Sequence, residues 1–206
     1  LLAELPEMDW PDKIKIAQTN WIGKSEGAEI TFQVDGSDDT ITVFSTRPDT
    51  IFGATFLVLA PEHPLARTLL TDETRELVEN YINDAVKKSE IERSNDTKEK
   101  TGVFSGSYAI NPATGQKIPI WIADYVLGGY GTGAVMGVPA HDDRDFAFAE
   151  KFELPVVEVI ERPEDDIDTD ACYHGEGVLV NSGAFDGTRS EDAREQIVAW
   201  LEQEGK

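Results

Sequence analysis

Short segments in which apolar and polar residues alternate constrain the fold of this chain more than any other feature. Residues 28–35 alternate in this way, and residues 40–45 do so again. Such alternation is typical of half-buried β-strands, because successive side chains point to opposite faces of a sheet. The intervening residues 36–39 (GSDD) are turn formers, so the sequence predicts a β-hairpin here.

The remaining patterns extend the same picture. A second hairpin is predicted between residues 103–110 and 117–123, and further strands are predicted at 56–60, 134–138, 156–160 and 178–181. Helical spacing of apolar residues predicts helices at 9–22, in two parts of 61–93, at 142–152 and at 190–204. Because the strands are many, short and joined by hairpins, we expect an α+β fold with a closed or nearly closed β-barrel and peripheral helices.

The charge of the chain excludes several function classes. Its 206 residues include 40 acidic and 18 basic side chains, a formal net charge of -22. Such a charge argues against general affinity for nucleic-acid backbones or anionic membranes.

No apolar stretch reaches the roughly 18 residues of a transmembrane helix, and the segment LLAELPEMDW has no signal-peptide pattern. The single cysteine, Cys172, excludes an intramolecular disulfide, and we expect a cytoplasmic location.

One candidate for chemistry is the segment STRPDT at residues 45–50. Pro48 fixes its own φ and restricts Arg47, so the loop has few conformations. A rigid loop that carries small hydroxyl groups suits a pocket that measures the shape of a small ligand. A plain turn with locally satisfied backbone groups explains the same residues.

Two further segments combine glycine or charge. GGYGTG at 128–133 lacks the lysine of a phosphate loop and the spacing of a dinucleotide motif, so it suits either a backbone surface for a nucleotide or a strand corner. HDDRD at 141–145 begins a predicted helix, where Asp142 is either an N-cap or a functional carboxylate. Asp145 would hold a cation if it projected towards the glycine-rich segment. The three histidines are scattered in sequence, and we expect no metal site.

Taken together, these segments resemble one known family. TRPDTIFGATFLVLAPEHPLA (46–66) and YGTGAVMGVPAHDDRDFAFAEKFELPV (130–156) closely resemble the editing domain of bacterial-type leucyl-tRNA synthetase, an insertion in the catalytic domain. WIGKSEGAEI (21–30) and GVLVNSGAFDGTRSEDA (177–193) resemble its two ends. The resemblance implies a linker from the catalytic domain at 1–27, a β-barrel core with inserted helices at 28–188, and a C-terminal helix with an outgoing linker at 189–206.

The resemblance also implies an activity. An editing domain hydrolyses the ester of tRNA(Leu) mischarged with isoleucine, norvaline or methionine and spares Leu-tRNA. Water is the nucleophile, and neither a cofactor nor a metal is implied. The chain has no HIGH-type or KMSKS-type motif, so ATP would be used only in the catalytic domain. The implied partners are the 3′ terminal adenosine of the mischarged tRNA and the rest of the synthetase in cis, with no membrane.

The resemblance assigns residue roles in the same way. Asp145 matches the aspartate that holds the α-ammonium group, and Thr50 matches the threonine that blocks the leucine side chain. Thr46 and Ser45 match a threonine pair near the water and the ester, with serine here at the first position. Arg47 matches an arginine near the tRNA terminus. The remaining matches are three pocket-wall positions, Tyr130, Met136 and Val138, and two positions close to the site, His141 and Asp142.

Three alternatives remain open on the sequence alone. A valyl-type or isoleucyl-type editing domain shares the threonine-rich loop. A non-catalytic tRNA-binding module would bind without turnover, although the net charge of -22 weighs against it. An unrelated barrel hydrolase would act on a small ester or a peptide without tRNA.

Overall fold

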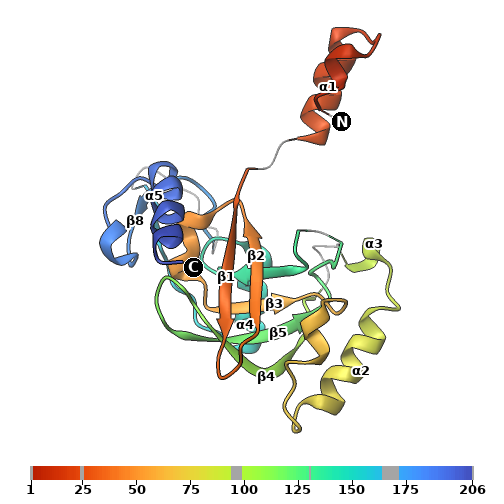
Figure 1. The fold of residues 1–206 in the computed structure, drawn as a ribbon, viewed down its shortest axis with the longest axis vertical. Coiled ribbons are helices and arrows are strands. Elements are labelled where there is room, and N and C mark those ends of the chain that lie inside the picture. The colour runs from red at the N-terminus through yellow and green to blue at the C-terminus, as the bar shows by residue number, and fades with distance from the viewer. Residues whose placement is uncertain (1, 24–25, 94–98, 130, 164–171, 206) are drawn as a thin grey trace.

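A six-stranded mixed sheet forms the centre of the molecule in the computed structural model (Figure 1), which describes residues 2–23, 26–93, 99–129, 131–163 and 172–205. The strand order is β2-β1-β4-β5-β3-β6. These strands are β1 (Ala28–Val34), β2 (Thr40–Ser45), β3 (Phe56–Leu59), β4 (Gly102–Ile110), β5 (Lys117–Ala123) and β6 (Ala134–Gly137). A second, two-stranded sheet pairs β7 (Ile160–Glu161) with β8 (Val178–Leu179).

Both predicted hairpins are confirmed. Strands β1 and β2 pair antiparallel, with Ile30 opposite Val43, so the alternating apolar residues share one buried face. Strands β4 and β5 also pair antiparallel, with a register shift between Phe104 and Tyr108. The β3–β5 pair is parallel, which makes the sheet mixed. Of the strand predicted at 156–160, only Ile160 lies in a strand.

The α+β class is confirmed, and of the two forms expected, a closed or a nearly closed barrel, the closed one is wrong. The edge strands β2 and β6 approach within 8 Å between Cα atoms. Within the described residues, however, no hydrogen-bonded ladder joins these two edges. Strand β6 has only four residues, all paired with β3, and Pro139 follows soon after. Among the described residues β6 pairs with β3 alone, so the sheet remains open between β6 and β2.

Helices cover the sheet and flank it. They are α1 (Asp12–Ile22), α2 (Arg75–Ala85), α3 (Glu90–Arg93), α4 (Asp143–Phe152) and α5 (Ser190–Gln203). The 3₁₀ turns are η1 (Leu5–Glu7), η2 (Pro48–Gly53), η3 (Pro64–Arg67) and η4 (Gly183–Phe185). Helix α1 has no buried residue and stands apart from the sheet in Figure 1. Helices α2 and α5, in contrast, each contribute buried apolar residues to the main core.

Helix α4 packs against the sheet through a separate aromatic cluster. Phe148 is fully buried, with its ring centroid 5.4 Å from Phe56 and 5.4 Å from Trp121. The Phe56 ring also lies close to the backbone of β6. Position 137 must therefore be glycine, because a Cβ there would lie 2.3 Å from this ring. This packing holds α4 against the sheet. The HDDRD segment leads into the first turn of this helix.

A buried amide fixes the loop that follows β2. Asn111, in the β4–β5 turn, donates from Nδ2 to the carbonyl oxygens of Ile51 (2.9 Å) and Ala54 (3.1 Å). Its Oδ1 accepts from the backbone amides of Ala113 and Thr114. Since Asn111 is fully buried, no water replaces these bonds if the side chain is lost.

We therefore expect Asn111→Ala to lower the free energy of unfolding by about 2–4 kcal/mol, because buried carbonyl and amide groups lose their partners. Gln33 is a matched control, since its exposed amide also donates to two backbone carbonyls. Gln33→Ala should cost less than about 1 kcal/mol. Urea unfolding of the two variants gives the comparison, and equal losses would contradict the anchoring role of Asn111.

Candidate functional site

The STRPDT segment folds into a compact 3₁₀ turn. Pro48 starts η2, and the backbone amide and the hydroxyl of Thr50 both donate to the Arg47 carbonyl oxygen, at 3.1 and 2.9 Å. Ser45 Oγ accepts from the Arg47 amide at 3.0 Å. Thr50 is buried and Thr46 is exposed, so the two threonines have different surroundings. The predicted rigidity of this loop thus has a direct hydrogen-bonded cause.

A fully buried carboxylate anchors the same turn. Asp49 lies 3.0 Å from Arg47 Nη2 and 3.3 Å from Arg194 Nε, which comes from α5. Glu176 also pairs with Arg194 and lies 3.9 Å from Arg47. Sequence reasoning missed Asp49, Arg194 and Glu176, because ion pairs between distant segments leave no local pattern. A buried carboxylate that carries its charge needs such cationic partners.

Helix α4 begins at a capped N-terminus. Asp142 Oδ1 accepts from the backbone amides of Arg144 (2.9 Å) and Asp145 (3.2 Å), and its carboxylate also pairs with the Arg144 guanidinium at 3.2 Å. The N-cap interpretation of Asp142, which the sequence left open, is therefore the one that the structure shows.

Asp145 turns from the first turn of α4 into the protein. Its side chain accepts from the Val138 amide at 2.9 Å and from the Tyr125 hydroxyl at 3.2 Å. Burial, with a smaller effect of the Asp142 charge, raises the pKa of Asp145 to about 7. The hydrogen bond to the Val138 amide places the carboxyl group directly beyond β6, where Met136 and Val138 are buried. Tyr125 was missed by sequence reasoning, and Tyr130 lies outside the described residues.

His141, which lies just before α4, forms hydrogen bonds with backbone groups of two other segments. Its Nδ1 lies 2.7 Å from the Tyr173 carbonyl oxygen, and its Nε2 lies 3.0 Å from the Val159 amide and 3.1 Å from the Ile160 amide. Because amides only donate, Nε2 accepts and Nδ1 carries the proton. Burial lowers the pKa of His141, in keeping with this neutral form. Both ring nitrogens are thus occupied by backbone groups, which gives the ring a structural role.

Residues 172–176 join the two motifs. Arg47 Nη1 donates to the His174 carbonyl oxygen at 3.2 Å, and His174 Nε2 lies 3.3 Å from Asp143 Oδ1. The Tyr173 amide donates to the Ala140 carbonyl oxygen at 3.0 Å. The η2 turn and the start of α4 therefore lie on the same side of the molecule.

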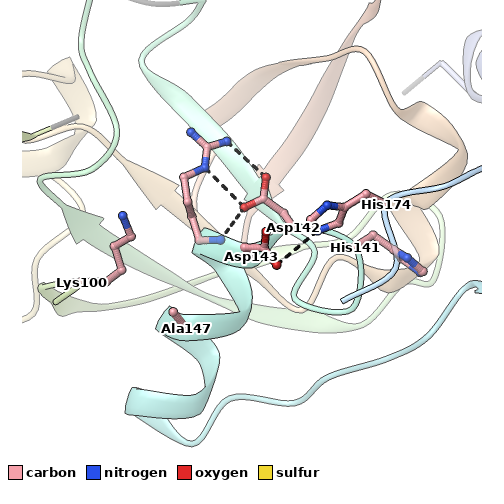
Figure 2. A pocket seen from close by; sticks show the side chains of 7 residues that line it. Lys100, His141, Asp142, Asp143, Ala147 and His174 are labelled. Atoms are coloured by element: carbon pink, nitrogen blue, oxygen red, sulfur yellow. Dashed lines mark hydrogen bonds and ion pairs between the residues drawn. The ribbon is translucent and has the colours of Figure 1, made fainter. Parts of the chain in front are cut away.

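A pocket of about 310 Å³ opens at this junction (Figure 2). Figure 2 shows Asp142, Asp143 and His174 together at the start of α4, with Ala147 further along the helix. Of the predicted site residues, His141 and Asp142 line this pocket. Four others, Thr50, Met136, Val138 and Asp145, are buried in the protein.

The described residues also hold one group of potential metal ligands. The ligand atoms of Asp143, Cys172 and His174 all lie within 4.8 Å of one another. The sequence analysis expected no metal site, and no local motif marks this group, because Asp143 is distant from Cys172 and His174 along the chain. In the same described residues, no helix is both long and apolar enough to span a bilayer.

The fold and this site together define an α+β domain with a rigid hydroxyl-bearing turn and a buried carboxylate near the end of an edge strand. A family model described as "Leucyl-tRNA synthetase, editing domain" matches residues 19–202. The chain belongs to this family, as the sequence resemblance indicated. The residue roles implied by that resemblance remain predictions.

A solved structure supports the same assignment. The chain is similar to the leucyl-tRNA synthetase agnB2 of Agrobacterium radiobacter K84, solved as a ternary complex with tRNA and LeuAMS, at 37% sequence identity and a TM-score of 0.73. The match covers 98% of this chain and 22% of that synthetase chain. The chain thus spans less than a quarter of the length of the protein that it matches.

The protonation of Asp145 predicts a pH effect on stability. The folded protein holds this proton up to about pH 7, whereas the usual aspartate pKa is 3.8. The contribution of Asp145 to stability therefore falls as the pH rises from about 4 to about 7, and it stays constant above that pH.

In Asp145→Asn this dependence is absent. We expect the unfolding free energy of the variant, relative to wild type, to increase by on the order of 3 kcal/mol between pH 4 and pH 8. Denaturant unfolding across this range measures the difference. Asp192→Asn, which changes an exposed acid in the first turn of α5, is the control. A difference that stays constant with pH for Asp145→Asn would refute the buried proton.

Proposed function

We propose that this domain hydrolyses the ester of tRNA(Leu) mischarged with isoleucine, norvaline or methionine and spares Leu-tRNA. The observation that carries the proposal is the Asp145 carboxyl group, which is buried beside Val138 at the end of β6. A carboxylate in a site of low polarity is a strong and selective partner for the α-ammonium group of an aminoacyl ester. The family membership supports the same chemistry.

The proposed reaction needs positioning more than activation. An aminoacyl ester is already reactive, so the site must hold it, place water and stabilise the developing oxyanion. Water is the nucleophile, and the proposed step uses no cofactor. Asp145 holds the ammonium group, while Ser45 and Thr46 supply hydroxyl groups near the ester. Since Asp145 has a pKa of about 7 in the free domain, substrate binding at lower pH must displace its proton.

Selection against leucine is assigned to Thr50. A single methylene difference provides only about 1–3 kcal/mol of discrimination in one binding step, which explains the need for a second site. The Thr50 hydroxyl is already engaged with the Arg47 carbonyl oxygen. The volume of the side chain, rather than its hydroxyl group, is therefore the feature that excludes leucine.

The proposed partners are the 3′ terminal adenosine of mischarged tRNA and the remainder of the synthetase in cis, in the cytoplasm. Arg47 is held in place by Asp49 and by the His174 carbonyl oxygen, so its guanidinium is positioned before any tRNA arrives. Because the net charge is -22, the domain alone should bind tRNA weakly.

The role of Thr50 is tested by Thr50→Ala, which we expect to allow hydrolysis of Leu-tRNA at least tenfold above the wild-type rate. Thr50→Val is the matched variant, because it keeps the volume but lacks the hydroxyl group. It should spare Leu-tRNA as the wild type does. Deacylation of radiolabelled Leu-tRNA and Ile-tRNA measures both. Leu-tRNA that is equally stable with wild type and Thr50→Ala would contradict the steric role.

The role of Asp145 is tested by Asp145→Asn, which keeps the shape and removes the negative charge. Hydrolysis of Ile-tRNA should fall at least 100-fold, an order of magnitude consistent with the loss of a charge-assisted contact. In wild type, KM should fall as the pH rises towards about 7, since the proton on Asp145 competes with the substrate ammonium, and should rise again above about pH 8, where the substrate amine loses its own proton. Unchanged deacylation by a folded variant, shown by circular dichroism, would refute this role.

A further inference from the structure

Three potential ligands of different chemistry meet beside the pocket. Asp143 comes from the first turn of α4, whereas Cys172 and His174 come from the segment 172–176. Their ligand atoms lie within 4.8 Å of one another. We propose that Asp143, Cys172 and His174 form a binding site for a divalent transition-metal ion of the zinc class.

The distances are close to those of a tetrahedral site. Thiolate, imidazole and carboxylate ligands at ordinary zinc distances lie about 3.3–3.6 Å apart. His174 Nε2 and Asp143 Oδ1 are already 3.3 Å apart. The Cys172 sulfur lies within 4.8 Å of both other ligand atoms, so it must approach them by little more than 1 Å at most.

The surroundings favour a mixed, partly open site. Cys172 is buried, and its Sγ donates to the Pro139 carbonyl oxygen at 3.3 Å, while the side chains of Asp143 and His174 are 74% and 51% exposed. Asp143 and His174 also line the 310 Å³ pocket. Three protein ligands with solvent at a fourth position are typical of accessible zinc sites. The set of one sulfur, one nitrogen and one oxygen ligand also disfavours Mg²⁺ and Ca²⁺, which prefer oxygen.

Nearby charges are compatible with a cation. Two basic side chains contact the backbone of residues 172–174. Arg162 Nη2 donates to the Cys172 carbonyl oxygen at 3.3 Å, and Arg47, which donates to the His174 carbonyl oxygen, is paired with Asp49. Arg144 pairs with Asp142. Lys100 lines the pocket but lies away from His174 in Figure 2. The bound ion would join residues 172–174 to α4 and, through the His174 carbonyl oxygen, would steady Arg47.

The test uses the purified chain, treated with a chelator and kept reduced. Co²⁺ is the first probe, because a thiolate ligand gives it a charge-transfer absorption that oxygen ligands do not give. We expect one equivalent of Co²⁺ to produce this band and Zn²⁺ to displace it. Cys172→Ser, which keeps a donor to Pro139, should abolish the band. His174→Ala and Asp143→Ala should weaken Zn²⁺ binding at least tenfold in a competition titration.

Asp192→Ala is the control, since it removes an exposed acid from the first turn of another helix, and it should bind Zn²⁺ as the wild type does. Circular dichroism verifies that each variant is folded. The proposal is overturned if wild type shows no thiolate band with Co²⁺. It is also overturned if His174→Ala or Asp143→Ala binds Zn²⁺ as tightly as wild type. Neither readout depends on deacylation, so this proposal and the proposed function fail independently.

Discussion

The packing of α4 against the sheet is the constraint on which the rest of the site depends. Phe148 lies between Phe56 and Trp121, and glycine at position 137 allows the Phe56 ring to approach the backbone. This contact fixes the helix axis relative to β6. The Asp145 carboxyl group can then reach the Val138 amide. Aromatic packing thus determines where a functional carboxyl group lies, although none of these rings belongs to the site.

Two buried carboxyl groups in the same region have opposite surroundings. Asp49 lies between the guanidinium groups of Arg47 and Arg194, so its charge is balanced within the domain. The two hydrogen bonds described for the Asp145 side chain come from neutral donors, an amide and a phenol. Burial therefore raises the pKa of Asp145, and an incoming ammonium group would supply the missing charge. Asp49 is suited to hold structure, and Asp145 is suited to bind a cation.

The sequence predicted what depends on local patterns. Both hairpins, the position of α4 and the capping alternative for Asp142 follow from periodicity and short-range hydrogen bonding. Closure of the sheet was not predictable, because it depends on how two edge strands that are distant in the chain, β2 and β6, lie relative to each other. The ion pair between Asp49 and Arg194 was missed for a similar reason. It joins segments that are distant in the chain, and only the packing of α5 brings them together.

The acidity of the domain suits binding of the aminoacyl end of the proposed substrate rather than the body of the tRNA. An aminoacyl-tRNA carries its positive ammonium group at the ester and its negative phosphates along the rest of the molecule. The electric field of a domain with a net charge of -22 attracts the ammonium group and repels the phosphates. Arg47, paired with Asp49, is a local cation at the η2 turn. The proposed domain therefore favours the aminoacyl end over the tRNA body, and affinity for the body must come from elsewhere in the synthetase.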